Sequence, residues 1–221
     1  MSEGFEDMVN AAQAFFAELS CNNRKDWFEP RKTHYVTQIR KPAELFAELL
    51  AEDLSRLTGV AHAPKLFRIY RDVRFARDKS PYNPWLHILW RPASADGLAP
   101  GWFFSCASGE LVLGLGVVSL KGPALTRYRE WIDTRGDLVA DAMTEVARTS
   151  GAQISNFGDA SLKRVPKPYA ADHPHADLLK RRGIAMMAPL PATWRKRGLL
   201  VSARDQASDM LPLWRAFHDH L

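Results

Sequence analysis

The sequence predicts an α+β domain in which helices from both ends of the chain cover an antiparallel sheet. Apolar residues recur at helical spacing between Phe5 and Leu57, and helical spacing returns after Pro123. Between these regions lie β-prone segments with short connections, an order that is typical of α+β proteins. The 221 residues contain no repeat, low-complexity tract or linker, so we expect a single domain over residues 1–221.

Three N-terminal helices are predicted from the apolar spacing. The first covers residues 5–19, and the second begins after a polar break, with Asn23 as its expected cap. Pro30 should kink the second helix or mark a fresh start, because proline lacks a backbone N–H. Pro42 opens the third helix at the favoured first position, and Gly59 closes it.

Four β-prone segments follow, and their short connections favour an antiparallel meander. The stretch 97–120 holds a single charge, Glu110, but its proline, serines and glycines argue against a membrane-spanning helix. Its ASGE sequence at 107–110 is typical of a turn between two strands. The expected strands cover residues 66–75, 85–90, 101–106 and 111–120.

The last third of the chain is predicted to be mainly helical. The expected elements are helices at about 123–132 and 137–148, a strand at 153–157, a short helix after Pro174, an apolar run at 184–190 and a last helix at about 209–220.

The net charge of +5 is unevenly distributed along the chain. Residues 63–91 carry seven basic and two acidic side chains, and residues 163–204 carry ten and two. If these two basic blocks meet in space, they form a positive surface for an anionic partner.

A cytoplasmic protein without a metal or cofactor is expected. The N-terminus is acidic and lacks the apolar run of a signal peptide, and Cys21 and Cys106 match no metal-binding spacing. The histidines of DHPHAD (172–177) favour a helix start over a metal site. The glycines at 114–116 lack the third glycine of a dinucleotide fingerprint.

The most unusual segment is FRIYRDVRFARDKSPY, residues 67–82, which is β-prone and yet rich in charge. Read as a strand, its first face is apolar except at the centre, where Arg71 lies. Because an unpaired buried guanidinium is costly, we expect Arg71 to pair with a carboxylate such as that of Asp78, or to line a cavity. A helix is the alternative, since the arginines recur every three residues.

This segment resembles the signature of a widespread, uncharacterised family of conserved hypothetical proteins, the domain of unknown function 2461. The blocks NNRKDWF (22–28), LTRYREWI (125–132) and LKRVPKPYAADHPHADLLKRRG (162–183) resemble further parts of the family, so the likeness covers nearly the whole chain. The resemblance implies a shared fold and a common polar region, and it implies no reaction. The matching residues of the signature are Arg68, Arg71, Asp72, Arg74, Phe75, Asp78, Lys79, Pro81 and Tyr82.

Seven residues of the signature are candidates for binding a ligand. Arginine and lysine suit phosphate and carboxylate, tyrosine adds a hydroxyl or a stacking face, and aspartate orients the arginines or acts as a base. The alternative is an ion-pair network that fastens the DKSPY turn to the sheet. The candidates are Arg68, Arg71, Asp72, Arg74, Asp78, Lys79 and Tyr82.

Two function classes follow from these features. The favoured one is a basic pocket that binds a phosphate- or carboxylate-bearing small molecule, and it leaves open whether a reaction is catalysed. The alternative is a non-catalytic module whose basic face binds nucleic acid or an acidic protein, with tryptophans for base stacking. Charges that converge on a concave pocket favour the first class, and a flat basic stripe favours the second.

Overall fold

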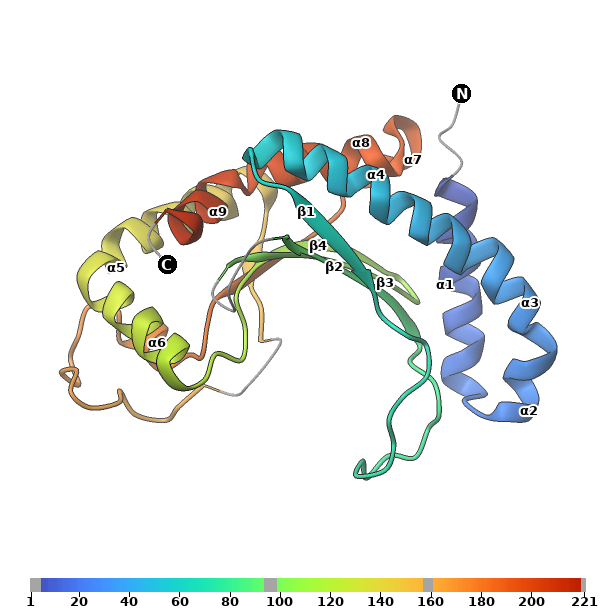
Figure 1. Ribbon diagram of the computed structural model, residues 1–221, viewed down its shortest axis with the longest axis horizontal. Coiled ribbons are helices and arrows are strands. Elements are labelled where there is room, and N and C mark those ends of the chain that lie inside the picture. Colours follow the sequence, from blue (N-terminus) through green and yellow to red (C-terminus); the bar gives the residue numbers. More distant parts are fainter. Residues whose placement is uncertain (1–4, 94–98, 157–160, 220–221) are drawn as a thin grey trace.

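The computed structural model describes residues 5–93, 99–156 and 161–219, and it contains one arched sheet with helices over its convex face (Figure 1). The strand order is β1-β2-β3-β4-β6-β5, and every neighbouring pair is antiparallel. The predicted α+β class is therefore confirmed. The strands are β1 (His62–Leu66), β2 (Trp85–Pro92), β3 (Gly101–Ala107), β4 (Glu110–Gly116), β5 (Gln153–Ile154) and β6 (Ala185–Pro189).

Side-chain alternation divides the sheet into a covered face and an open face. Every second residue of β2 is buried, while the residues between are only partly buried or exposed. The buried face packs against the helices, and Trp90 also donates a hydrogen bond from Nε1 to the Ala47 carbonyl at 2.8 Å. Large side chains that reach the core from this face are Leu86, Ile88, Trp90, Trp102, Phe104 and Leu113.

The N-terminal helices follow the predicted breaks. Pro30 lies in a short 3-10 turn, and Gly59 ends the third long helical stretch with a φ of 75°. The predicted cap at Asn23 is wrong, because its side-chain amide instead bonds both backbone groups of Tyr82. The elements are α1 (Phe5–Cys21), α2 (Lys25–Phe28), the 3-10 turn η1 (Glu29–Arg31), α3 (Lys32–His34), the π-helix η2 (Tyr35–Arg40) and α4 (Lys41–Thr58).

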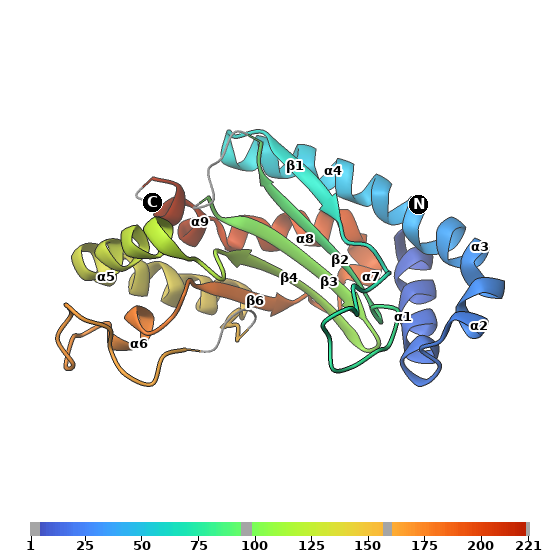
Figure 2. The ribbon, with the colours of Figure 1, turned by 60° about the horizontal axis from the view of Figure 1, so that its bottom comes forward.

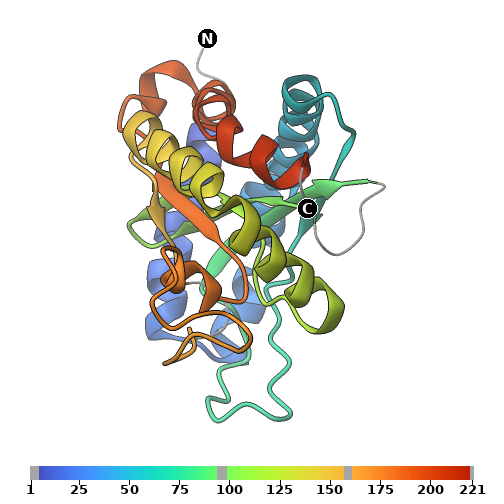
Figure 3. The same ribbon diagram turned by 90° about the vertical axis from the view of Figure 1, so that its left-hand side faces the viewer.

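The C-terminal helices differ in part from the prediction. The two helices expected at 123–132 and 137–148 form one helix, α5 (Gly122–Ser150), with a kink at Arg135. It packs beside α9, as Figure 3 shows. Of the predicted strand at 153–157 only the first two residues form a strand, β5. Phe157, at the end of that predicted strand, and His220, at the end of the predicted last helix, lie outside the described residues. The other helices are α6 (Ala176–Leu179), α7 (Trp194–Arg197), α8 (Leu199–Asp209) and α9 (Leu211–His218).

The predicted strand at 66–75 is wrong. Strand β1 ends at Leu66, and the following residues form a loop that protrudes beyond the sheet (Figure 1). A single bridge between Tyr70 and Tyr82 continues the ladder. The physical reason is the absence of a packing layer, since Phe75 at the tip is 96% exposed and a β-prone side chain gains little without a surface to cover it.

No helix in the described ranges is both long enough and apolar enough to cross a lipid bilayer.

Candidate functional site

Ion pairs within the protruding loop, residues 67–82, hold most of its charged side chains. The Arg71 guanidinium donates to Asp78 at 2.5 Å, and the second Asp78 oxygen accepts hydrogen bonds from the backbone and hydroxyl of Ser80. These bonds hold the pKa of Asp78 well below its usual range. Arg74 binds Asp72 through two bonds of 2.9 and 2.7 Å, which lowers the pKa of that carboxyl.

The expected partner of Arg71 is therefore confirmed, although its surroundings differ from the prediction. The Arg71 side chain is 27% exposed and lies in a loop rather than at the centre of a sheet face. Lys79 donates to the Val73 carbonyl at 3.0 Å, and Tyr82 is buried against Phe28 with ring centroids 4.2 Å apart. These contacts support the alternative that the charged residues form an ion-pair network, which fastens the DKSPY turn to the sheet. Ligand binding by the seven candidates stays a prediction.

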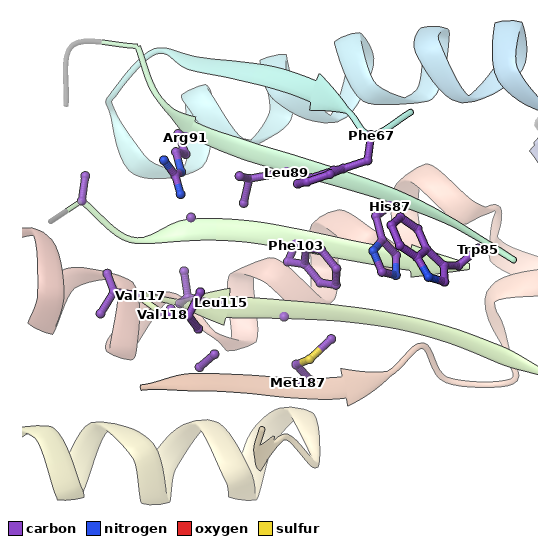
Figure 4. A pocket seen from close by; sticks show the side chains of 15 residues that line it. Phe67, Trp85, His87, Leu89, Arg91, Phe103, Leu115, Val117, Val118 and Met187 are labelled. Atoms are coloured by element: carbon purple, nitrogen blue, oxygen red, sulfur yellow. The ribbon is translucent and has the colours of Figure 1, made fainter. Parts of the chain in front are cut away.

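A cavity lies on the open face of the sheet, where no predicted site residue is found. Its volume is about 400 Å³, and four strands contribute to it (Figure 4). Aromatic and aliphatic side chains form its walls, and small residues form its floor. The principal lining residues are Phe67, Trp85, His87, Leu89, Arg91, Gly101, Phe103, Gly114, Gly116, Ala185 and Met187.

His87 is a polar residue in the wall of this cavity, and it lies beside Trp85 (Figure 4). Its ring stacks on Trp85 at 3.6 Å and meets Phe103 edge-on at 4.8 Å. Burial lowers the pKa of His87 to about 4, so the ring is neutral at pH 7. Within the described residues neither ring nitrogen has a hydrogen-bond partner, so the neutral ring offers one donor and one acceptor to a ligand.

Arg91 supplies a positive charge at one end of the same cavity. It lies two strand positions beyond Leu89 on the open face, and its side chain is directed along that face (Figure 4). No carboxylate in the described part of the chain forms an ion pair with it. The guanidinium is therefore available to an anionic group.

Glycines of β3 and β4 keep the cavity open. The sheet register pairs Phe103 with Gly114 and Gly101 with Gly116. A side chain at either glycine of β4 would meet β6, since a Cβ on Gly114 would lie 2.7 Å from Met187 Cγ. The space over the floor thus depends on two residues without side chains.

The sequence-based prediction missed this cavity, although β2 carried a signal. In WLHILWR (85–91), alternation places His87 and Arg91 on one face with Trp85 and Leu89. A histidine in that pattern is usually an ordinary sheet residue. Its position in a cavity becomes apparent only when β3 and β4 place Phe103 and the glycines beside it.

The histidines of the DHPHAD segment are held by α5. His173 Nε2 lies 3.1 Å from Asp133, and His175 Nε2 lies 3.0 Å from Asp137. The predicted helix start is confirmed, because α6 begins at Ala176. Among the described side chains, no cluster of three or more acidic, histidine or cysteine ligands could hold a metal ion.

One family model, described as "Conserved hypothetical protein (DUF2461)", matches residues 11–215. The chain belongs to this family. The DUF2461 match includes all six strands and the loop 67–82, so the resemblance found in the sequence is confirmed over nearly the whole chain. No curated protein matched the chain.

Proposed function

We propose that this DUF2461 protein binds a small molecule that has a flat apolar body and a phosphate or carboxylate group. The observation that carries the proposal is the aromatic lining of the open sheet face. An uncovered face of an antiparallel sheet is ordinarily polar, whereas this one surrounds a cavity of about 400 Å³ with aromatic rings. A concave, mainly apolar cavity with few polar groups is the usual form of a small-molecule site.

Different side chains of the cavity contact different parts of the ligand. Phe67 and Phe103 contact the flat body of the ligand, and the glycine floor leaves room for it. Neutral His87 offers a hydrogen bond within the apolar surroundings. Arg91 pairs with the anionic group at the end of the cavity.

The loop 67–82 has a supporting role in this proposal. Its excess of arginine and lysine raises the local concentration of anions near the cavity, and Phe67 at its start forms part of the wall. The loop and the segment 161–175, which contains the start of the second basic block, lie toward opposite ends of the sheet (Figure 2). That separation supports the small-molecule class over the nucleic-acid class.

A fluorescent probe tests this proposal. The dye 8-anilinonaphthalene-1-sulfonate is flat, aromatic and anionic, and its emission rises in an apolar site. At about 0.3 kcal/mol per non-hydrogen atom, we expect one dye per chain with a Kd of tens of micromolar. Ala185→Phe places a ring in the cavity and should weaken binding at least about tenfold.

The control is Ala61→Phe, which adds the same ring at an exposed position outside the cavity. Its dye affinity should equal that of the wild type. If Ala185→Phe proves unfolded by circular dichroism, Arg91→Gln replaces it, with an expected loss of about tenfold for one charge-assisted hydrogen bond. Wild-type affinity in folded variants of both lining residues would refute the proposal, as would tighter binding of single-stranded DNA than of the dye.

A further inference from the structure

A second cavity, of about 270 Å³, lies between the N-terminal helical segment and the start of the protruding loop. Phe67 lines both cavities, so the two are neighbours. In contrast to the first cavity, this one has several positive side chains in its wall. The lining residues that bear on its chemistry are Phe28, Lys32, Tyr35, Arg40, Arg68 and Tyr70.

Positive charge exceeds negative charge around this cavity. Lys32 and Arg68 have no ion-pair partner in the described ranges. Arg40 Nε donates to Glu44 at 2.9 Å, and its terminal amino groups bond no other described residue. Three cations against one carboxylate leave a charge that matches a phosphate dianion better than a single carboxylate.

Tyr35 adds a neutral donor that has no hydrogen-bond partner among the described residues. The side chain is only 5% exposed, and its ring packs against Phe15 and Phe28. Its hydroxyl bonds no other described residue, although buried tyrosine hydroxyls usually find a partner. Burial is the main cause that raises the pKa of Tyr35 to about 12, so the group stays an O–H donor at pH 7.

The backbone of η2 places two of these groups on one wall. Residues 35–40 form a π-helix, in which hydrogen bonds join residues i and i+5. Such helices are rare in proteins, and those that occur are often found at functional sites. That winding brings Tyr35 and Arg40, which are five residues apart, to the same side of the helix. In an ordinary α-helix these two positions would point in different directions.

We propose that this second cavity binds phosphate, as the free ion or as the phosphate group of an organic molecule. Arg68 and Lys32 neutralise the anion, the Tyr35 hydroxyl donates to one of its oxygens, and Arg40 completes the cationic wall. The site is separate from the one proposed for the open sheet face. It assigns a binding role to Arg68 that does not depend on the ion pairs at the tip of the loop.

The test is a calorimetric titration with inorganic phosphate. The ionic strength is held constant, and chloride serves as the reference anion. Arg68→Gln removes one charge-assisted contact and should raise the phosphate Kd about tenfold. Tyr35→Phe removes only the hydroxyl and should raise Kd several-fold. The control is Arg77→Gln, which removes the same charge from an exposed position of the same loop outside the cavity and should leave Kd within about twofold.

The outcomes separate this site from the first. Arg68→Gln should retain dye binding, and Ala185→Phe should retain phosphate binding, so either site can fail alone. A larger affinity for phenyl phosphate than for inorganic phosphate identifies the organic form as the ligand, and equal affinity identifies the free ion. The proposal is overturned if phosphate gives the wild-type protein no heat of binding above that of chloride. It is also overturned if Arg77→Gln raises the phosphate Kd as much as Arg68→Gln does.

Discussion

Replacement of Gly116 with alanine is expected to lower the free energy of unfolding by about 4 kcal/mol, a large effect for a single methyl group. Gly116 has a φ of 151°, which L side chains rarely adopt, and it lies on the floor of the open-face cavity. A Cβ there would lie 2.0 Å from the Ile184 carbonyl oxygen and 2.5 Å from Ala185 Cα. Because both atoms belong to the backbone, the strands β4 and β6 would have to separate.

The matched control is Gly109→Ala in the turn between β3 and β4. Gly109 also has a positive φ, 72°, but a Cβ there would meet nothing within 4 Å. That variant should lose only about 1 kcal/mol, the ordinary cost of a side chain in left-handed backbone. Urea denaturation measures both values. Equal losses would show that the approach of β6 to Gly116 is not as close as described.

Acidification is expected to destabilise the protein through His87. In the unfolded chain this histidine titrates near 6.5, whereas burial lowers its pKa to about 4 in the folded protein. Between these two pH values the unfolded state binds more protons than the folded state. The contribution of neutral His87 to the free energy of unfolding is therefore fully present above pH 6.5, and it is lost as the pH falls toward 4. The difference of roughly two to three pKa units corresponds to about 3 kcal/mol.

His87→Phe keeps a ring on Trp85 but removes the titration. The loss of stability between pH 7 and pH 4 should therefore be smaller in this variant than in the wild type by about 3 kcal/mol. Burial also lowers the pKa of His62, but that contribution is common to both proteins and cancels in the comparison. Denaturant midpoints across this range provide the measurement. Parallel pH profiles would mean that His87 is as accessible to protons in the folded state as in the unfolded state.

The predictable part of the fold consists of features with local causes. The ASGE turn between β3 and β4, the helix end at Gly59 and the break at Pro30 each depend on a few adjacent residues, and all three are present. The strand predicted at 66–75 fails because β propensity describes a side chain that has a surface to pack on. The exposed ring of Phe75 shows that this segment has none.

The candidate sites depend on contacts between distant parts of the chain. Residue types identified the charged loop and the pairing of Arg71 with Asp78, which are seven residues apart. No local pattern shows that Phe103 faces Gly114, or that Arg68 shares a cavity with Lys32 and Tyr35. Both cavities arise from sheet register and helix packing, which single-sequence periodicity does not determine.

The most direct test of the central claim, that the open sheet face is a ligand site, uses the methyl groups of two adjacent methionines. Met187 lines the open-face cavity, while Met186 is buried on the opposite side of β6. In a methyl-labelled sample titrated with 8-anilinonaphthalene-1-sulfonate, ring currents of the bound dye should shift the Met187 resonance strongly and leave Met186 nearly unchanged. A saturating titration in which the Met187 resonance does not move would contradict the claim.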